Sequence, residues 1–124
     1  MISVPKCVLI VDDHVAVRKA LRSLFNLNGL TVCGEAVNGR DAIEKAMRLH
    51  PDLIVLDLSM PVMDGLEAAR ELTKLLPDIP LMMFTNHVSH LMELNARSAG
   101  IWKVISKNEP YEGLMYHARK FLSL

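Results

Sequence analysis

Several features that would restrict the function are missing from this sequence of 124 residues. No apolar run reaches the roughly 18 to 20 residues that a membrane span requires, and the N-terminus lacks the charged-then-apolar pattern of a secretion signal. The 14 Lys and Arg residues balance the 14 Asp and Glu residues, so no net positive field exists to hold nucleic acid. We therefore expect a soluble, cytoplasmic protein with no membrane contact and no direct nucleic-acid binding by this segment.

Cysteine is also scarce, with Cys7 and Cys33 as the only two in the chain. Both lie within apolar segments typical of strands, and neither belongs to the kind of Cys or Cys/His cluster that zinc requires. We interpret them as small buried hydrophobic residues, in preference to disulfide partners or metal ligands. The sequence therefore predicts neither a zinc site nor a disulfide.

The chain does contain a regular alternation of strand-like and helical segments, and 51% of its residues are hydrophobic. Five short apolar runs have the length and residue types of strands: residues 7–11, 30–36, 53–58, 79–85 and 101–105. Each is followed by an amphipathic helical pattern, the least regular around residues 87–99 and the clearest from Tyr111 to Leu122. Asp64, with Glu67 three residues later, is typical of a capped helix start.

This alternation indicates the fold class. Apolar strands that alternate with amphipathic helices are typical of a parallel sheet covered on both faces. Five such units favour an α/β, doubly wound, flavodoxin-like (βα)5 fold with strand order 2-1-3-4-5. No linker or internal repeat interrupts the pattern, so we expect one domain spanning residues 1–124.

Reactive side chains follow four of the predicted strands. In an open parallel sheet, ligands bind beyond the carboxyl ends of the strands, where the strand order reverses. The residues at these ends are Asp12 and Asp13, Asp57, Thr85, and Lys107. Taken singly, each has an ordinary structural explanation, but together they predict one site with three carboxylates, a hydroxyl and an ammonium group.

The charges at this site indicate its chemistry. Carboxylates about 4 to 6 Å apart repel one another by ~4 kcal/mol per close pair at an effective dielectric near 20. Carboxylate, carbonyl and water oxygens are the ligands that Mg²⁺ prefers, and Lys107 supplies a second positive charge. Neutralised in this way, Asp57 can accept a phosphoryl group, and Thr85 can hydrogen-bond one of its oxygens.

The sequence closely resembles the receiver domains of response regulators, over essentially all 124 residues. The segment VLIVDDH at residues 8–14 resembles the acidic motif of that family, and IVLDLSMPVMDG at residues 54–65 resembles its phosphoacceptor motif around Asp57. Thr85 and Lys107 match the hydroxyl and the lysine of the family. Residues 12–14 and 75–80 also resemble receivers that precede a helix-turn-helix output domain.

The resemblance implies a role for each of these positions. Mg²⁺ would be bound by the side chains of Asp13 and Asp57 and the backbone carbonyl of Ser59, with Asp12 acting largely through water. A sensor histidine kinase would donate the phosphoryl group to Asp57. The domain would be no enzyme beyond catalysing its own phosphorylation and dephosphorylation.

Departures from the family pattern concern the coupling of the site to its output. Val104 stands where the family often has Tyr or Phe, Lys103 where Gly is common, and Asn86 where a small residue is usual. Asn108 replaces the usual Pro after Lys107, so we expect a trans peptide bond there.

The output surface expected from the resemblance comprises the fourth helix, fifth strand and fifth helix, where Trp102 and Val104 would contact a second copy or an output domain. A half-buried tryptophan packed on a helix is the simpler alternative.

Two other functions fit parts of the pattern. A haloacid-dehalogenase-type phosphohydrolase also combines Asp, Mg²⁺, Thr and Lys, but it requires a second acid two residues after the nucleophile, where this chain has Ser59. A receiver-like docking or dimerisation scaffold that accepts no phosphate is the other alternative. The intact acidic set favours phosphoacceptance.

Overall fold

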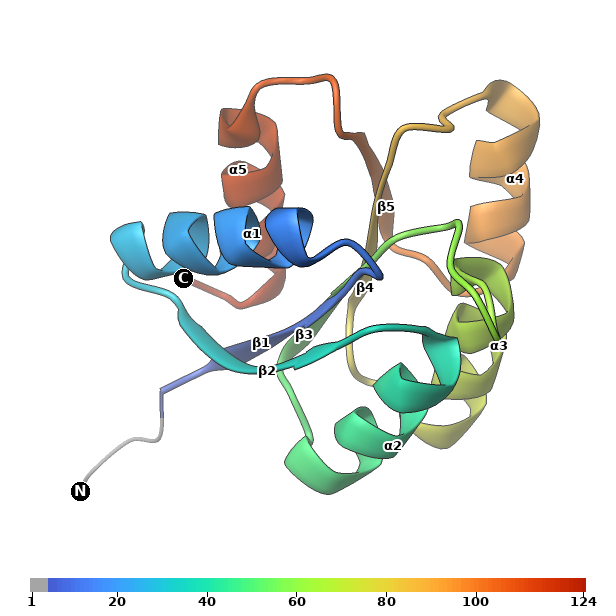
Figure 1. The fold of residues 1–124 in the computed structure, drawn as a ribbon, viewed down its shortest axis with the longest axis horizontal. Coiled ribbons are helices and arrows are strands. Elements are labelled where there is room, and N and C mark those ends of the chain that lie inside the picture. The colour runs from blue at the N-terminus through green and yellow to red at the C-terminus, as the bar shows by residue number, and fades with distance from the viewer. Residues whose placement is uncertain (1–4) are drawn as a thin grey trace.

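The computed structural model describes residues 5–124 as an alternation of strands and helices (Figure 1). The strands are β1 Cys7–Val11, β2 Thr31–Ala36, β3 Leu53–Leu56, β4 Leu81–Thr85 and β5 Lys103–Ser106. The helices are α1 Val15–Leu27, α2 Gly39–Leu49, α3 Gly65–Leu75, α4 His90–Ser98 and α5 Tyr111–Phe121. The predicted (βα)5 alternation is therefore confirmed.

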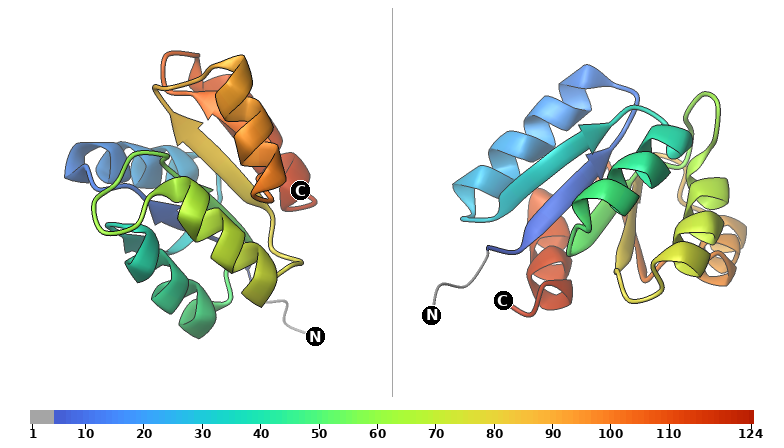
Figure 2. Two further views of the ribbon diagram at one scale, coloured as in Figure 1. Left: turned by 90° about the vertical axis from the view of Figure 1, so that its right-hand side faces the viewer. Right: turned by 90° about the horizontal axis from the view of Figure 1, so that it is seen from below.

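The five strands form one parallel sheet in the order β2-β1-β3-β4-β5, as the sequence predicts. Helices α1 and α5 cover one face of the sheet, and α2, α3 and α4 cover the other (Figures 1 and 2). Alternate strand residues point to the two faces, so Val8 and Ile10 pack with α1 and α5, whereas Leu9 and Val11 pack in the layer of α2 to α4. The doubly wound fold follows from this two-sided burial.

Two strands begin two residues later than the apolar runs indicate. The β4 strand begins at Leu81 rather than residue 79, and the preceding Pro80 has no amide hydrogen for the sheet. The β5 strand begins at Lys103 because the amide of Ile101 still bonds to the carbonyl of Ala96 in the turn after α4. Apolar runs show where buried segments lie but do not show where their hydrogen bonding to the sheet begins.

Side-chain caps fix the starts of three helices. Asn38, Asp64 and Ser89 each accept the backbone N–H three residues later, at α2, α3 and α4 respectively. A cap of this kind contributes about 1 kcal/mol. The predicted cap at Asp64 is confirmed, and α4, expected around residues 87–99, begins at His90 because Ser89 provides its cap.

The interpretation of the cysteines as separate buried residues was wrong. Cys7 and Cys33 form a disulfide between β1 and β2, with Cα atoms 5.4 Å apart. Val8 pairs with Val32 and Leu9 with Gly34, so Cys33 is an extra residue in a bulge of β2. The pairing depends on this register shift, which apolar periodicity does not reveal.

Two further expectations concern the backbone and the membrane. No peptide bond among residues 5–124 is cis, which confirms the trans bond expected between Lys107 and Asn108. Within the same residues, none of the helices combines the length and the apolarity needed to cross a bilayer.

Candidate functional site

Two of the predicted acids lie side by side at the carboxyl ends of β1 and β3. The amide of Asp12 donates to the carbonyl of Ala36, and the amide of Asp57 donates to the carbonyl of Val11, both at 3.0 Å. The sheet ladder thus continues one residue past each strand and fixes both backbones. Both side chains are buried, with 2% of Asp12 and 5% of Asp57 exposed.

Lys107 connects these two acids. Its Nζ lies 2.8 Å from Oδ2 of Asp12 and 3.4 Å from Oδ2 of Asp57. Its amide donates to the carbonyl of Thr85 at 2.9 Å, which places Lys107 just beyond β5 and beside the end of β4. Burial opposes the charged form, but the hydrogen bond to Asp12 and the charges of both acids outweigh it and raise the pKa of Lys107. The side chain is therefore held as an ammonium ion.

The charge of the cluster is not balanced by Lys107 alone. Burial and the neighbouring charge of Asp12 raise the pKa of Asp57, although Lys107 and the amide of Leu58 act in the opposite direction. Three carboxylates, those of Asp12, Asp13 and Asp57, face one ammonium group. A divalent cation would relieve the remaining repulsion.

Asp13 provides a test of whether a metal ion fits. Its Oδ1 is buried and has no hydrogen-bond partner among the described residues, and buried polar atoms ordinarily have one. Asp12, Asp13, His14 and Asp57 each offer a ligand atom, and these four atoms all lie within 4.8 Å of one another. An orphaned oxygen within a set of mostly carboxylate donors fits a divalent ion that prefers oxygen ligands.

Thr85 and Ser59 lie around this cluster. Thr85 is fully buried at the end of β4, and its hydroxyl accepts the amide of His87 at 3.2 Å. Ser59 lines a cleft of about 380 Å³ that also includes Asp57 and Lys107. The structure thus brings Asp12, Asp57 and Lys107 into direct contact and places Ser59 in the wall of the same cleft.

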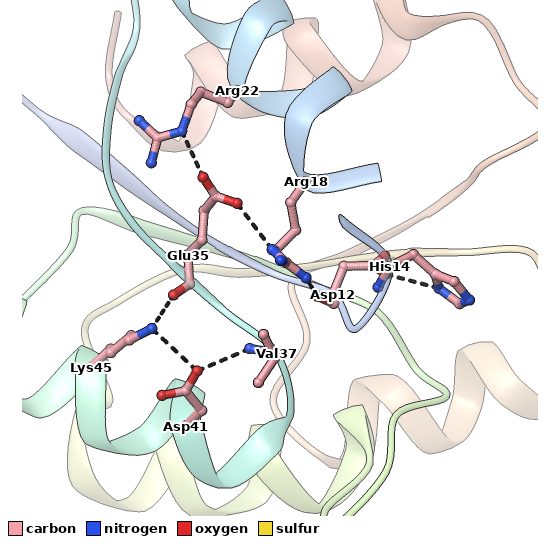
Figure 3. Close-up of polar contacts among 8 residues, drawn as sticks. All are labelled: Asp12, His14, Arg18, Arg22, Glu35, Val37, Asp41 and Lys45. Atoms are coloured by element: carbon pink, nitrogen blue, oxygen red, sulfur yellow. Dashed lines mark hydrogen bonds and ion pairs between the residues drawn. The ribbon is translucent and has the colours of Figure 1, made fainter. Parts of the chain in front are cut away.

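The sequence analysis missed an arginine that holds the loop carrying the acids (Figure 3). Arg18 of α1 donates from Nη1 to the carbonyl of Asp12 at 2.8 Å and from Nε to Oε1 of Glu35 at 3.0 Å. Arg22, one turn later, donates from Nε to Oε2 of the same Glu35 at 2.7 Å. Burial opposes ionisation of Glu35, but the bonds to both arginines outweigh it and lower its pKa. The sequence does contain one signal of this network, because Glu35 is a charged residue inside a predicted strand.

The same network extends to α2 (Figure 3). Lys45 donates to the carbonyl of Glu35 and, at 3.2 Å, to Oδ2 of Asp41. This carboxylate oxygen also accepts the amide of Val37, just beyond β2, at 3.0 Å. Polar contacts therefore join α1, β2 and α2 to the loop of Asp12.

His14 is a second residue that the sequence analysis did not assign. Its amide donates to Oδ1 of Asp12 at 2.9 Å. Its ring Nδ1 lies 3.2 Å from Oδ1 of Asp12 and 3.2 Å from Oδ1 of Asp13. The His14 side chain is 66% exposed, and it lies beside Asp12 just before α1 (Figure 3).

Gly65, the first residue of α3, touches the backbone of Asp57. A Cβ atom at this position would overlap the carbonyl oxygen of Asp57, so only glycine fits. Its amide donates to the carbonyl of Leu58 at 2.7 Å. The Asp-Gly pair at residues 64–65 thus combines a helix cap with a close backbone approach.

Trp102 and Val104 lie on the face formed by α4, β5 and α5. The Trp102 ring is 53% exposed and meets Phe121 of α5 edge-on, with ring centroids 5.4 Å apart. Trp102 and Val104 both line a pocket with Glu93 and Arg97 of α4. The alternative of a half-buried tryptophan packed on a helix is therefore observed, together with an exposed half.

Comparisons with known proteins agree with this geometry. Residues 8–119 match the family model of the response regulator receiver domain. The chain is 39% identical over 117 residues to the response regulator protein VraR of Staphylococcus saprophyticus, covering 94% of this chain and 56% of that protein. It is 37% identical over 102 residues to the chemotaxis protein CheY of Thermotoga maritima, covering 82% of this chain and 85% of that protein. The chain thus spans about half the length of the VraR relative.

Solved structures show the same fold. A two-component response regulator of the LuxR family from Aurantimonas sp. SI85-9A1 superposes with a TM-score of 0.91 at 27% identity, covering 97% of this chain and 86% of that chain. The response regulator domain of Thermotoga maritima CheB superposes with a TM-score of 0.89 at 26% identity, covering 98% of both chains.

Proposed function

Since the chain belongs to the response regulator receiver domain family of two-component signalling, we propose that it accepts a phosphoryl group on Asp57 from a sensor histidine kinase, with Mg²⁺ bound beside it. A carboxylate oxygen of Asp57 forms the new bond to phosphorus as the phosphorus–nitrogen bond of the donor phosphohistidine breaks. Water later hydrolyses the acyl phosphate and restores the carboxylate. We propose that residues 1–124 form one cytoplasmic receiver domain and catalyse only these two reactions on themselves.

The observation that carries this proposal is the contact of Lys107 with both Asp12 and Asp57, beside an oxygen of Asp13 that has no hydrogen-bond partner within residues 5–124. We assign Mg²⁺ to the side chains of Asp13 and Asp57 and the carbonyl of Ser59, with Asp12 acting through water. When bound, the ion neutralises the charge of the transferring oxygens. Lys107 supplies a fixed positive charge at the same oxygens.

Thr85 has a separate role in this proposal. Its hydroxyl accepts the amide of His87, and its own hydrogen can be donated to a phosphoryl oxygen on Asp57. The segment after β4 carries His87 and leads into α4. A change at Thr85 would therefore reach α4 through the chain itself.

The proposed output surface is the α4–β5–α5 face. Trp102 is exposed there beside Val104 and would contact a second copy of the chain or an output domain. Val104 is half-buried and packs against the apolar layer of α4. With no aromatic ring at this position, we propose that the shape change takes place by movement of α4 and β5 rather than by rotation of a ring.

Val104 also supports a second candidate, a docking or dimerisation scaffold that accepts no phosphate. This aliphatic residue packs against the core. It therefore cannot provide the aromatic ring that often takes part in switching in the family. The phosphohydrolase alternative has no such support, because Ser59 stands where a second acid is needed and residues 8–119 match the receiver domain model.

Phosphorylation by a small donor separates the two candidates. The protein is incubated with Mg²⁺ and acetyl phosphate, and its intact mass is measured. We expect one phosphoryl adduct that is absent when EDTA is added and absent in Asp57→Asn. The matched control is Asp64→Asn, which changes an acid in the following loop and retains a side chain suited to capping α3, and it should form the adduct.

Two outcomes would contradict the proposal. An adduct at the wild-type level in Asp57→Asn would show that another residue is the acceptor. The absence of an adduct in a folded wild-type protein would favour the scaffold.

A further inference from the structure

We propose that His14 is an additional ligand of the metal ion at the acidic cluster and that its imidazole shifts the preference of the site from Mg²⁺ toward Mn²⁺. The proposal rests on the proposed function, because it uses the same carboxylates. It concerns which ion binds there and which atoms hold it.

The position of the ring is the first observation. Nδ1 of His14 lies 3.2 Å from Oδ1 of Asp12 and 3.2 Å from Oδ1 of Asp13. The backbone amide of His14 donates to Asp12, which keeps the residue close to the acids. The ring nitrogen therefore lies near both carboxylates, of which Figure 3 draws that of Asp12, although most of the His14 side chain is exposed.

The second observation is the orphaned oxygen of Asp13. Nδ1 also lies within hydrogen-bonding distance of Oδ1 of Asp12, but a metal ion would need the tautomer with its proton on Nε2, which leaves the Nδ1 lone pair free. The contact with Oδ1 of Asp13 is not a hydrogen bond, and this buried oxygen has no partner among the described residues. A cation bound by both Nδ1 and Oδ1 would satisfy the oxygen and explain why both atoms face the same point.

The spacing of the donors fits a single ion. Ligand atoms of Asp12, Asp13, His14 and Asp57 all lie within 4.8 Å of one another. Opposite ligands of a small octahedral ion are about 4.2 Å apart, from a ligand distance near 2.1 Å. Small side-chain movements therefore bring the imidazole into the coordination sphere, and the exposed ring is free to make them.

The chemistry of the imidazole gives the preference for the ion. Mg²⁺ favours oxygen ligands and retains its waters, so His14 adds little to its binding. Mn²⁺ shares the preference of Mg²⁺ for carboxylates, but as a first-row transition ion it accepts a nitrogen ligand more readily than Mg²⁺ does. A site with carboxylates and one imidazole should thus gain more affinity for Mn²⁺ than for Mg²⁺.

The experiment compares His14→Asn with His87→Asn, because both histidines line the same cleft and only His14 belongs to the group of ligand atoms. Mn²⁺ and Mg²⁺ binding are measured by calorimetry at one pH, and thermal unfolding without metal verifies the fold. We expect His14→Asn to weaken Mn²⁺ binding by about tenfold or more, in the range typical for loss of a group that supports a metal site. Mg²⁺ binding should change by less than about twofold, and His87→Asn should leave both affinities unaltered.

Pulsed EPR of the Mn²⁺-loaded protein then identifies the ligand. An imidazole nitrogen bound to Mn²⁺ gives a ¹⁴N hyperfine coupling, which we expect in the wild type and in His87→Asn but not in His14→Asn. Tight Mn²⁺ binding without this coupling in the wild type, or a coupling that persists in His14→Asn, would overturn the assignment of His14 and leave the acidic site intact. A folded wild type that binds neither ion would overturn the proposed function as well.

Discussion

The two edges of the site are held in different ways. We call β2, β1 and α1, with the loop of Asp12, the acidic edge. Arg18 and Arg22 bind the carboxylate of Glu35 in β2, and Lys45 donates a hydrogen bond to the carbonyl of the same residue. A disulfide also joins β1 to β2. Charged hydrogen bonds between elements therefore fix the backbone that carries the acids.

The α4–β5–α5 face has weaker connections. Its contacts include the Trp102–Phe121 ring pair and the hydroxyl of Thr73 in α3, which donates to the carbonyl of Ala99 at 3.1 Å. The first residues after β4, Asn86 and His87, are exposed. Charged hydrogen bonds between elements thus hold the acidic edge, whereas the loop after β4 is exposed. The switching proposed above would use this difference, with the acids staying in place while the loop after β4 and α4 move.

The largest expected effect comes from the disulfide. Opening the link between Cys7 and Cys33, which are 26 residues apart, should lower the free energy of unfolding by about 3 to 4 kcal/mol. Urea unfolding with and without a thiol reductant measures this effect, and Cys33→Ser provides the matched control, since reductant should not affect it. Equal stability with and without reductant in the wild type would show that the disulfide does not stabilise the acidic edge. In a compartment that keeps thiols reduced, the lower value would apply.

A smaller effect is expected from Arg18→Ala, compared with Arg22→Ala. Both variants lose an ion pair with Glu35, but only Arg18 also binds the carbonyl of Asp12. Arg18 is 15% exposed and Arg22 is 41% exposed, so we expect losses of about 2 kcal/mol and less than about 1 kcal/mol respectively.

Urea unfolding and a Mg²⁺ titration verify this prediction. Mg²⁺ affinity should fall several-fold in Arg18→Ala alone, because only that variant frees the loop of Asp12. Equal losses of affinity in the two variants would mean that Glu35, rather than the contact with Asp12, holds the acidic edge.

Trp102→Ala should lower stability by less than Arg18→Ala does. With half of the ring exposed and one aromatic contact, the loss should be about 1 kcal/mol. The phosphoryl adduct should form as in the wild type, whereas association that depends on phosphorylation, measured by sedimentation with acetyl phosphate, should weaken. Leu27→Ala at the end of α1, which removes another exposed apolar side chain, is the control for general loss of apolar surface. A loss of adduct formation in Trp102→Ala would show that the two regions are not separate.

The fold and the central acids were predictable because they depend on simple periodic rules. Buried strands and amphipathic helices have different periods, and carboxyl ends of neighbouring parallel strands lie at one edge. Asp12, Asp57 and Lys107 are therefore brought together by topology alone. The cap at Asp64 is a local feature and was predictable for that reason.

The features that sequence analysis missed depend on contacts between distant elements. The pairing of Cys7 with Cys33 requires a bulge in β2, which only the registry with β1 reveals. Arg18 reaches Glu35 because α1 lies over β2, and no apolar pattern encodes the direction of a long polar side chain. His14 follows the acids directly in sequence, but the direction of its ring depends on the backbone at the start of α1.

The contact between Gly65 and Asp57 has a mechanical consequence. Not even a methyl group fits between the start of α3 and the carbonyl oxygen of Asp57, and the amide of Gly65 donates to the carbonyl of Leu58. The two backbones are therefore in direct contact and cannot move independently. A tilt of the acceptor peptide would be transmitted directly to the first turn of α3. The packing of α3 against α2 and α4 would in turn resist such a tilt, so the helix supports the backbone of Asp57 from behind.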